Sequence, residues 1–257
     1  DCAVYKNSPS RVRELGDLLY ADRTSDAQHV LLLAFPHLLS FFLKNGVGAR
    51  EFLPVYLALL DVLVLGDSFS TEDWNTTESL IAASLEAGLD KSQYDDLLDC
   101  IITLWGEKGS AASLDWSLDI LDLLAVFPRQ NFDELCRLYY SVLATLRSDA
   151  RRVKSAQWEM IELLSVDFDR TSDLEGLKPD LDLSEVHGSG VDLSGKLVAI
   201  YTLTESAGAR SKAILERMFP KVKVRLSHDH GGTNPLKVLA RDADYFVLAS
   251  RSATHSA

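Results

Sequence analysis

The chain has 257 residues, of which 47% are apolar and 25% are charged, and its formal net charge is −12. This apolar fraction is enough to bury a core, so wholesale disorder is not expected, and the length fits one large domain or two ordinary ones. The charge is uneven: residues 190–257 carry 10 basic and 6 acidic side chains, whereas residues 1–189 carry 16 basic and 32 acidic ones. We therefore expect the C-terminal part, and not the N-terminal part, to meet anions.

The cysteines and the apolar runs indicate the compartment. Cys2, Cys100 and Cys136 are odd in number and far apart, which fits neither a metal site nor a disulfide framework and favours a reducing, cytoplasmic compartment. The most apolar run, Val30–Leu43, contains Pro36 and is too short to span a bilayer, so no membrane association is expected. Because the chain starts at Asp1 and stops just after a predicted strand, we expect it to be part of a longer protein.

Helical spacing dominates the chain up to about Asp167. Ser8 followed by Pro9, and also Asp90 and Asn131, are predicted helix N-caps, and Gly46 is a predicted C-terminal glycine. The predicted helices are Pro9–Ala21, Ala27–Lys44, Arg50–Leu65, Thr77–Ala87, Ser92–Trp105, Leu114–Val126, Phe132–Leu146 and Arg152–Val166.

The spacing of these helices predicts their arrangement. Helix starts recur about every 20 residues, so that helix pairs recur about every 40, a period typical of HEAT or armadillo hairpin repeats. Because no sharp repeat consensus emerges, an irregular bundle is the alternative. Either architecture suits a scaffold, so we expect the helical half to dock a partner protein. The tryptophans at helical spacing are interpreted as core residues: Trp74, Trp105, Trp116 and Trp158.

An acidic segment separates the two halves. Residues 167–195 contain eight acidic side chains, Pro179 and four glycines, and their apolar residues follow no regular period. We therefore predict a helical domain over 1–166, a linker over 167–195, and a third segment over 196–257 that continues in the full-length protein.

The segment 196–257 alternates strands and helices, which predicts a parallel βαβαβ module. Its middle strand alternates apolar residues with Lys221, Lys223 and Arg225, as an edge strand does, whereas the first and third strands are continuous apolar runs typical of strands covered on both faces. The strand order should therefore be 2-1-3, as in flavodoxin-like sheets. The predicted elements are Leu197–Leu203, Glu205–Phe219, Val222–Ser227, Thr233–Arg241 and Tyr245–Ala249.

This strand order predicts a ligand crevice between the first and third strands. The loops Thr202–Gly208 and Ser250–Ser256 flank it and offer hydroxyls, cations and a helix N-terminus that could hold phosphate. Glu205 would repel phosphate but could accept a hydrogen bond from a ribose hydroxyl. The alternative is that these residues are only N-caps and surface hydroxyls. The candidate ligand-binding residues are Thr204, Glu205, Ser206, Arg210, Ser250, Arg251, Thr254 and His255.

A second constellation follows the middle strand. His228, Asp229 and His230 could bind a metal or relay protons, which would suit a hydrolase or a transferase. Histidines on a glycine-rich loop are also common turn residues, and no convincing third and fourth metal ligands accompany these. GxGxxG and GxxxxGK[ST] motifs are absent from the sequence. We therefore expect no metal and no cofactor, and we favour a non-enzymatic role.

Taken together, the layout resembles ligand-sensing Rossmann-like modules on helical-repeat scaffolds in bacterial conflict and antiviral defence proteins. The resemblance covers Lys196–Ala257 and rests on Thr202–Arg210 and Ser250–His255. It implies a sensor or adaptor that recognises a nucleotide or nucleic acid, with the readout elsewhere. A purely structural assembly component is a further alternative. The basic residues of the middle strand would either contact phosphates or only prevent this edge strand from pairing with another chain.

Overall fold

The structure is a computed structural model that describes residues 50–66, 69–177, 192–202, 205–229 and 231–249, together with isolated helical positions before residue 50. The predicted helices over 9–21 and 27–44 fall largely outside these residues, and so does Cys2. The chain divides into two compact units, residues 1–148 and 149–257, and each is described by itself.

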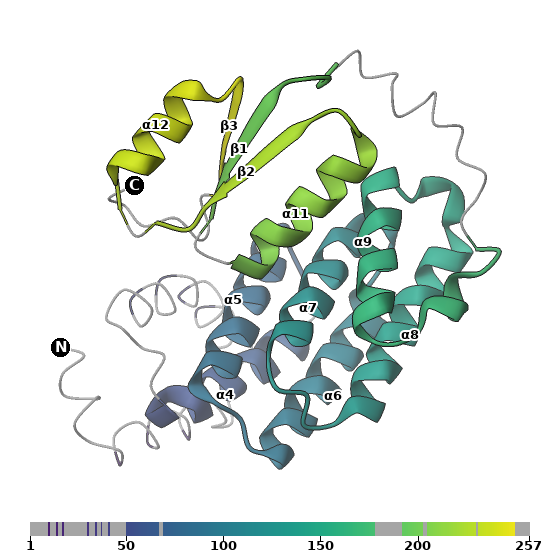
Figure 1. Ribbon diagram of the computed structural model, residues 1–257. Helices are drawn as coiled ribbons and strands as arrows, with labels where there is room; N and C mark the ends of the chain where they lie inside the picture. The colour runs from purple at the N-terminus through teal and green to yellow at the C-terminus, as the bar shows by residue number, and fades with distance from the viewer. Residues whose placement is uncertain are drawn as a thin grey trace. The chain divides into compact units, whose positions relative to one another are not determined.

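The described part of the first unit is entirely helical (Figure 1), as predicted. Each helix contacts the next but one along the chain: α4 packs on α6, α6 on α8, and α5 on α7. This is the arrangement of helical hairpins stacked in two layers. Its elements are η1 (Arg50–Phe52), α4 (Leu53–Val64), α5 (Thr71–Ala87), α6 (Lys91–Lys108), η2 (Ala111–Ser113), α7 (Leu114–Val126) and α8 (Phe132–Ser148).

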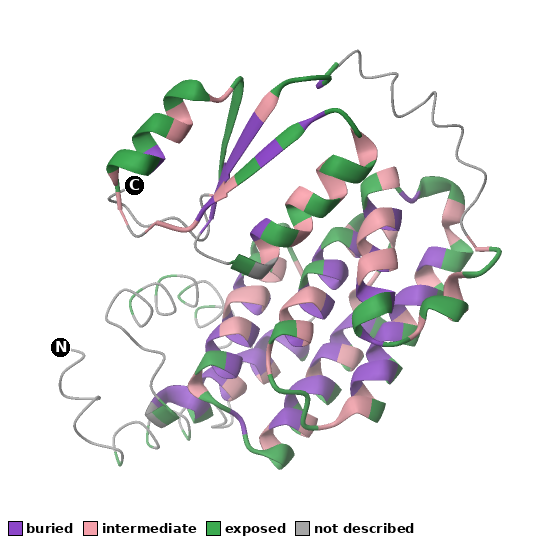
Figure 2. Ribbon diagram, in the orientation of Figure 1, coloured by how far each residue is buried: buried purple, intermediate pink, exposed green. Residues whose placement is uncertain are grey.

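Helix α4 lies in the core of this unit. Nine of its 12 residues are buried (Figure 2), and Tyr56, Ala58 and Leu59 have no exposed surface. A helix that is apolar on all sides is stable only where neighbours cover each side, which α5 and α6 do here. Helix α8 is amphipathic instead: Leu135, Tyr139 and Val142 are buried, while Arg137 and Tyr140 face solvent.

Capping residues set the helix starts. Helix α5 begins at Thr71, six residues before the predicted Thr77, because Ser70 and Asp73 form a capping box. The Ser70 hydroxyl accepts from the Asp73 N–H, and the Asp73 carboxylate accepts from the Ser70 N–H at 2.6 Å. The predicted N-caps Asp90 and Asn131 are confirmed, since their side chains accept from the N–H groups of Gln93 and Glu134.

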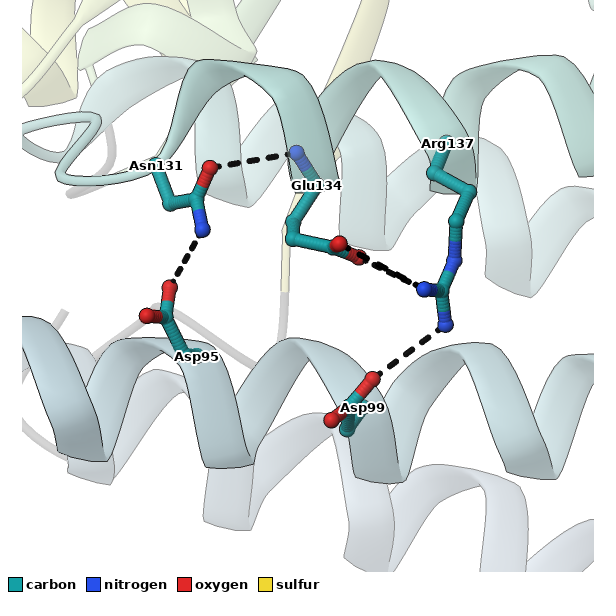
Figure 3. Close-up of polar contacts among 5 residues, drawn as sticks. All are labelled: Asp95, Asp99, Asn131, Glu134 and Arg137. Atoms are coloured by element: carbon teal, nitrogen blue, oxygen red, sulfur yellow. Dashed lines mark hydrogen bonds and ion pairs between the residues drawn. The ribbon is translucent and has the colours of Figure 1, made fainter.

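Polar contacts join α6 to α8 along one side (Figure 3). Asn131 Nδ2 donates to Asp95 Oδ1 at 2.6 Å, and Arg137 lies 3.2 Å from Asp99 and 3.1 Å from Glu134. Because the side chains of Arg137 and Asp99 are 56% and 69% exposed, this ion pair contributes at most about 1 kcal/mol. The apolar layer beneath it therefore carries most of the packing energy between the two helices.

The tryptophans are core residues, as predicted, with one partly exposed. Trp105, Trp116 and Trp158 are buried, while Trp74 is half-buried. The rings of Trp74 and Trp116 lie 4.5 Å apart, and Trp116 Nε1 donates to the Trp74 carbonyl at 3.1 Å. The Trp105 ring stacks on Trp116 at 6.4 Å, so α5, α6 and α7 meet in one aromatic cluster, in which the Trp116 N–H group is hydrogen-bonded.

The second unit contains a three-stranded parallel sheet of order β2-β1-β3, which confirms the predicted 2-1-3 order. Because crossovers between parallel strands are almost always right-handed, this order is expected to put the two connecting helices on opposite faces of the sheet. The elements of this unit are η3 (Ala150–Arg152), α9 (Ser155–Asp167), η4 (Thr171–Leu174), β1 (Leu197–Tyr201), α11 (Glu205–Met218), β2 (Lys223–Ser227), α12 (Asn234–Asp242) and β3 (Tyr245–Leu248).

One face of the sheet packs against α11. Its small core is formed by Leu193, Val198, Ile200, Val222 and Val224, against which Leu215 and Phe219 pack. Since side chains alternate along a strand, the basic residues of β2 lie on the opposite face, in register with Leu197 and Ala199.

The prediction that the third strand is covered on both faces is wrong. All four residues of β3, from Tyr245 to Leu248, are between 40% and 50% exposed. The reason lies in the strand order. Helix α11 contacts β2 and α12 contacts β1, so neither crossover helix extends over β3. Strand β3 is instead an apolar edge.

Asp244 anchors the start of β3 to β1. Its carboxylate accepts from the Leu197 N–H at 2.8 Å and from Lys196 Nζ at 2.9 Å, and its own N–H donates to the Leu197 carbonyl. The Leu197 N–H, and after it the Lys196 ammonium, hold the pKa of the Asp244 carboxyl below its usual value. This contact therefore stabilises the fold above the ordinary pKa of an aspartate and is lost as the pH falls through the lowered one.

Two observations bear on the predicted compartment. Among the described helices, none is long and apolar enough to cross a membrane. Neither Cys100 nor Cys136 forms a disulfide. The Cys100 Sγ donates to Asp61 Oδ1 at 2.9 Å between α6 and α4, and burial, followed by this hydrogen bond, raises the pKa of the Cys100 thiol.

Two glycines near the end of α6 should respond to alanine in opposite ways. A Cβ at Gly109 would lie 2.2 Å from the Trp105 carbonyl and 2.6 Å from its ring, whereas a Cβ at Gly106 would meet nothing within 4 Å. We expect Gly109→Ala to lower the free energy of unfolding by about 1–3 kcal/mol. Gly106→Ala should raise it by up to about 1 kcal/mol, because alanine is the better helix former. Denaturant unfolding of both variants checks this, and equal effects would contradict it.

Candidate functional site

The carboxyl ends of β1 and β2 are held together by Thr202. Its N–H donates to the Ser227 carbonyl at 3.1 Å, and its own carbonyl lies 2.6 Å from His228 Nδ1. Thr202 is only 3% exposed. Both main-chain groups of this residue are therefore committed to the end of β2, which fixes how the loop after β1 leaves the sheet.

His228 lies against the first turns of α11. A Cβ at Gly208 would come within 2.9 Å of His228 Cε1 and of Thr202 Cγ2, so a glycine is needed for this close approach. Because the Thr202 carbonyl can only accept, Nδ1 must carry the proton. In a neutral ring, Nε2 is then the nitrogen that can accept a hydrogen bond from a ligand or a proton from a reacting group.

Asp229 supports the next turn of the chain. Its carbonyl accepts from the Tyr201 hydroxyl at 2.8 Å, and its carboxylate accepts from the Thr233 hydroxyl. The Thr233 side chain in turn caps α12 by accepting from the Leu236 N–H. Asp229 thus joins the end of β1 to the start of α12.

These contacts bear on the predicted His-Asp-His constellation. His228 and Asp229 hydrogen-bond to different partners, so they do not form an acid–base dyad in this structure. His230 lies outside the described residues. Within the described part of the chain, no group of three or more His, Cys, Asp or Glu side chains could hold a metal ion.

Most residues of the predicted crevice between β1 and β3 lie outside the residues that the structure describes. This holds for Thr204, Ser250, Arg251, Thr254 and His255, and for Ser206 only the backbone, within α11, is described. Glu205 is exposed in the first turn of α11. The convergence of these residues on one ligand therefore stays a prediction.

Arg210, the other described member of the crevice set, is engaged elsewhere. Its guanidinium Nη1 lies 2.5 Å from Asp167 Oδ2 at the end of α9, and the side chain is 17% exposed. Gly208, two residues earlier on the same helix, faces the sheet instead. Gly208 and Arg210 therefore project from α11 in different directions, so Gly208 lies against His228 whereas Arg210 lies against Asp167.

A basic stripe runs along the edge strand and the turn before it. We use this name for Lys221, Lys223 and Arg225, all of which are exposed and have no acidic partner within the part of the chain that the structure describes. Six other cations of this unit have carboxylate partners: Arg152, Lys196, Arg210, Lys212, Arg217 and Arg241. The alternation of basic and apolar residues in the sequence indicated these exposed charges. The structure adds that no acidic side chain among the described residues pairs with them.

Comparison with known proteins gives a match at the level of a family. A family model described as DpdD-like matches residues 2–257. No curated protein and no solved structure matches the chain.

Replacing Gly208 tests the packing of this site. We expect Gly208→Ala to displace the His228 ring from Thr202 and to lower the free energy of unfolding by about 1–3 kcal/mol. In a background that combines His228→Ala with Thr202→Ser, both groups that the new methyl would meet are gone. The same substitution should there be neutral or stabilise by up to about 1 kcal/mol. A double-mutant cycle of unfolding free energies checks this, and an equal cost in both backgrounds would contradict the described contact.

Proposed function

Because the chain belongs to the DpdD-like family, a component of the multi-protein Dpd defence system, we propose that it is a sensor or adaptor whose second unit binds a phosphate-bearing ligand, nucleic acid in particular. The observation that carries this proposal is the basic stripe of Lys221, Lys223 and Arg225. Phosphates are neutralised by lysine and arginine side chains, and the stripe is the feature of the described residues best suited to such contact.

The geometry of the stripe supports contact with a phosphate backbone. Alternate residues of a strand project on the same side about 6.6 Å apart, which is the spacing of Lys223 and Arg225 on β2. Lys221 lies in the turn two residues before β2, so the three cations are spread along this edge and are not gathered at a point. A row of charges can neutralise successive phosphates and release their counterions, which gives affinity without reading the base sequence. The proposed role of the stripe is therefore to bind and orient the nucleic acid.

The predicted crevice completes the proposal. Thr204, Ser206, Ser250, Arg251, Thr254 and His255 are proposed to contact the ligand from the β1/β3 side, and Glu205 to accept from a sugar hydroxyl. Readout is proposed to pass to a partner protein through the helical half. That half carries most of the acidic residues of the chain and is thus suited to a protein partner and unsuited to nucleic acid.

An enzymatic role is the second candidate. It is favoured by His228, whose Nδ1 bond to Thr202 leaves Nε2 available at the carboxyl edge of the sheet, where α/β enzymes place their reacting groups. Asp229 is committed to Thr233, so a reaction would need His230 or a ligand group as the second participant. A hydrolase or transferase activity lost in His228→Ala but not in Asp229→Asn would favour this candidate.

Charge reversal of the stripe tests the main proposal. We expect Lys221→Glu, Lys223→Glu and Arg225→Glu together to abolish binding of the full chain to oligonucleotides, with little change in melting temperature, because all three side chains are exposed. Wild-type binding should weaken with salt along a log–log slope of about −2.7 for duplex or −2.1 for a single strand, which corresponds to three phosphate contacts. Fluorescence anisotropy at several salt concentrations measures both.

The matched control reverses three other basic residues of the same unit. Arg151, Arg152 and Lys154 lie at η3 and just before α9, and their reversal to glutamate changes the net charge equally. This control should weaken binding only slightly. If it abolishes binding while the reversed stripe still binds, then the stripe only guards an edge strand and the proposal is wrong.

A further inference from the structure

Helix α11 carries two arginines that point toward α9. Arg210 and Arg217 are seven residues apart, two helical turns, and therefore share one face of the helix. Both are held by carboxylates. Arg210 lies 2.5 Å from Asp167, and Arg217 lies 2.9 Å from Glu159 and 3.0 Å from Glu162. The contacts also fix the direction of the helices, since the start of α11 meets the end of α9.

The polar contacts across this interface are ion pairs, in which three carboxylates meet two guanidinium groups. The side chain of Arg217 is 52% exposed, whereas those of Arg210, Glu159 and Glu162 are 17%, 14% and 25% exposed. The pairs of Arg217 are therefore the ones that salt screens most. An interface of this kind can be opened by an anion that competes for the arginines.

Arginine is also the side chain best suited to phosphate. Its planar guanidinium can donate two parallel hydrogen bonds to phosphate oxygens as readily as to carboxylate oxygens. The carboxylates of α9 therefore occupy the positions that phosphate oxygens would take on α11.

We propose that α9 is an autoinhibitory segment, whose Glu159, Glu162 and Asp167 withhold Arg210 and Arg217 from nucleic-acid phosphates. This inference rests on the proposed function, because it assumes that the second unit binds such phosphates. In the closed state the basic stripe is the available contact, and release of α9 exposes two further arginines, on the other side of the sheet from the stripe. The protein would then bind weakly until a long or concentrated polyanion displaces the helix.

Neutralising α9 without shortening its side chains tests this. The variant carries Glu159→Gln, Glu162→Gln and Asp167→Asn in the full chain, and the probe is a labelled oligothymidylate of about 16 nucleotides. We expect this variant to bind the probe about tenfold more tightly at low salt, because the two arginines can then form charged hydrogen bonds with phosphates. The log–log salt slope should steepen by about 1.4, because each added single-strand phosphate contact contributes about 0.7.

Two further variants make the result specific. Adding Arg210→Gln and Arg217→Gln to the neutralised variant should remove the gain in both affinity and slope. The control Glu86→Gln, Asp96→Asn and Glu107→Gln neutralises three exposed acids of the first unit and should leave the slope unchanged. A purely structural role of α9 would lower the melting temperature without steepening the slope, and that result overturns the proposal.

The remaining outcomes separate this inference from the proposed function. If the neutralised variant gains affinity through the arginines while reversal of the stripe has no effect, α9 is inhibitory and the stripe is not the site. If stripe reversal abolishes binding and the neutralised variant gains nothing, the autoinhibition alone is wrong. Should the triple variant fail to fold, Glu159→Gln with Glu162→Gln frees only the half-exposed Arg217, and the slope should then steepen by about 0.7.

Discussion

The second unit depends on β1 being hydrogen-bonded on both sides by parallel strands. Parallel neighbours require crossover connections, and because such connections are right-handed in nearly all proteins, the chain is expected to cross to β2 on one face and return to β3 on the other. Everything else about the site follows from this. Helix α11 covers the apolar side of β2, the side that carries Lys223 and Arg225 remains exposed, and the carboxyl ends of β1 and β2 lie side by side.

The same constraint explains why the site is built on main-chain groups. Thr202 is fixed from both its N–H and its carbonyl, and His228 can approach α11 only because residue 208 has no side chain. These groups are held by contacts within the protein itself. The loop after β2 is thus preorganised, whereas the arginines of α11 depend on ion pairs that solvent can weaken.

Much of this could be predicted from the sequence where one local pattern determines one local structure. The alternation of Lys221, Lys223 and Arg225 identified an edge strand and through it the strand order, and Asp90 and Asn131 identified helix starts. The start of α5 was missed, although Ser70 and Asp73 carry the capping-box spacing. The resemblance to defence-system proteins is confirmed at the level of the system, whereas ligand sensing stays a proposal.

Other features depend on packing and could not be predicted. Arg210 was assigned to a ligand because it lies near the crevice in the sequence, but its partner Asp167 is 43 residues away and meets it only when α9 packs on α11. Strand β3 is a continuous apolar run, and sequence alone does not distinguish such a strand in the middle of a sheet from one at its edge. Which neighbours cover β3 depends on where the crossover helices lie. The sequence of the strand itself carries no information about their positions.

The exposed β3 has a consequence for handling the protein. It offers four apolar residues in extended conformation with neither lysine nor proline among them, unlike β2 at the other edge of the sheet. Short segments of this kind template further strands and are common starting points of aggregation. In the described part of the chain this strand is therefore the first place where self-association would start, and Val247→Lys is the natural substitution for keeping the 257-residue chain in solution.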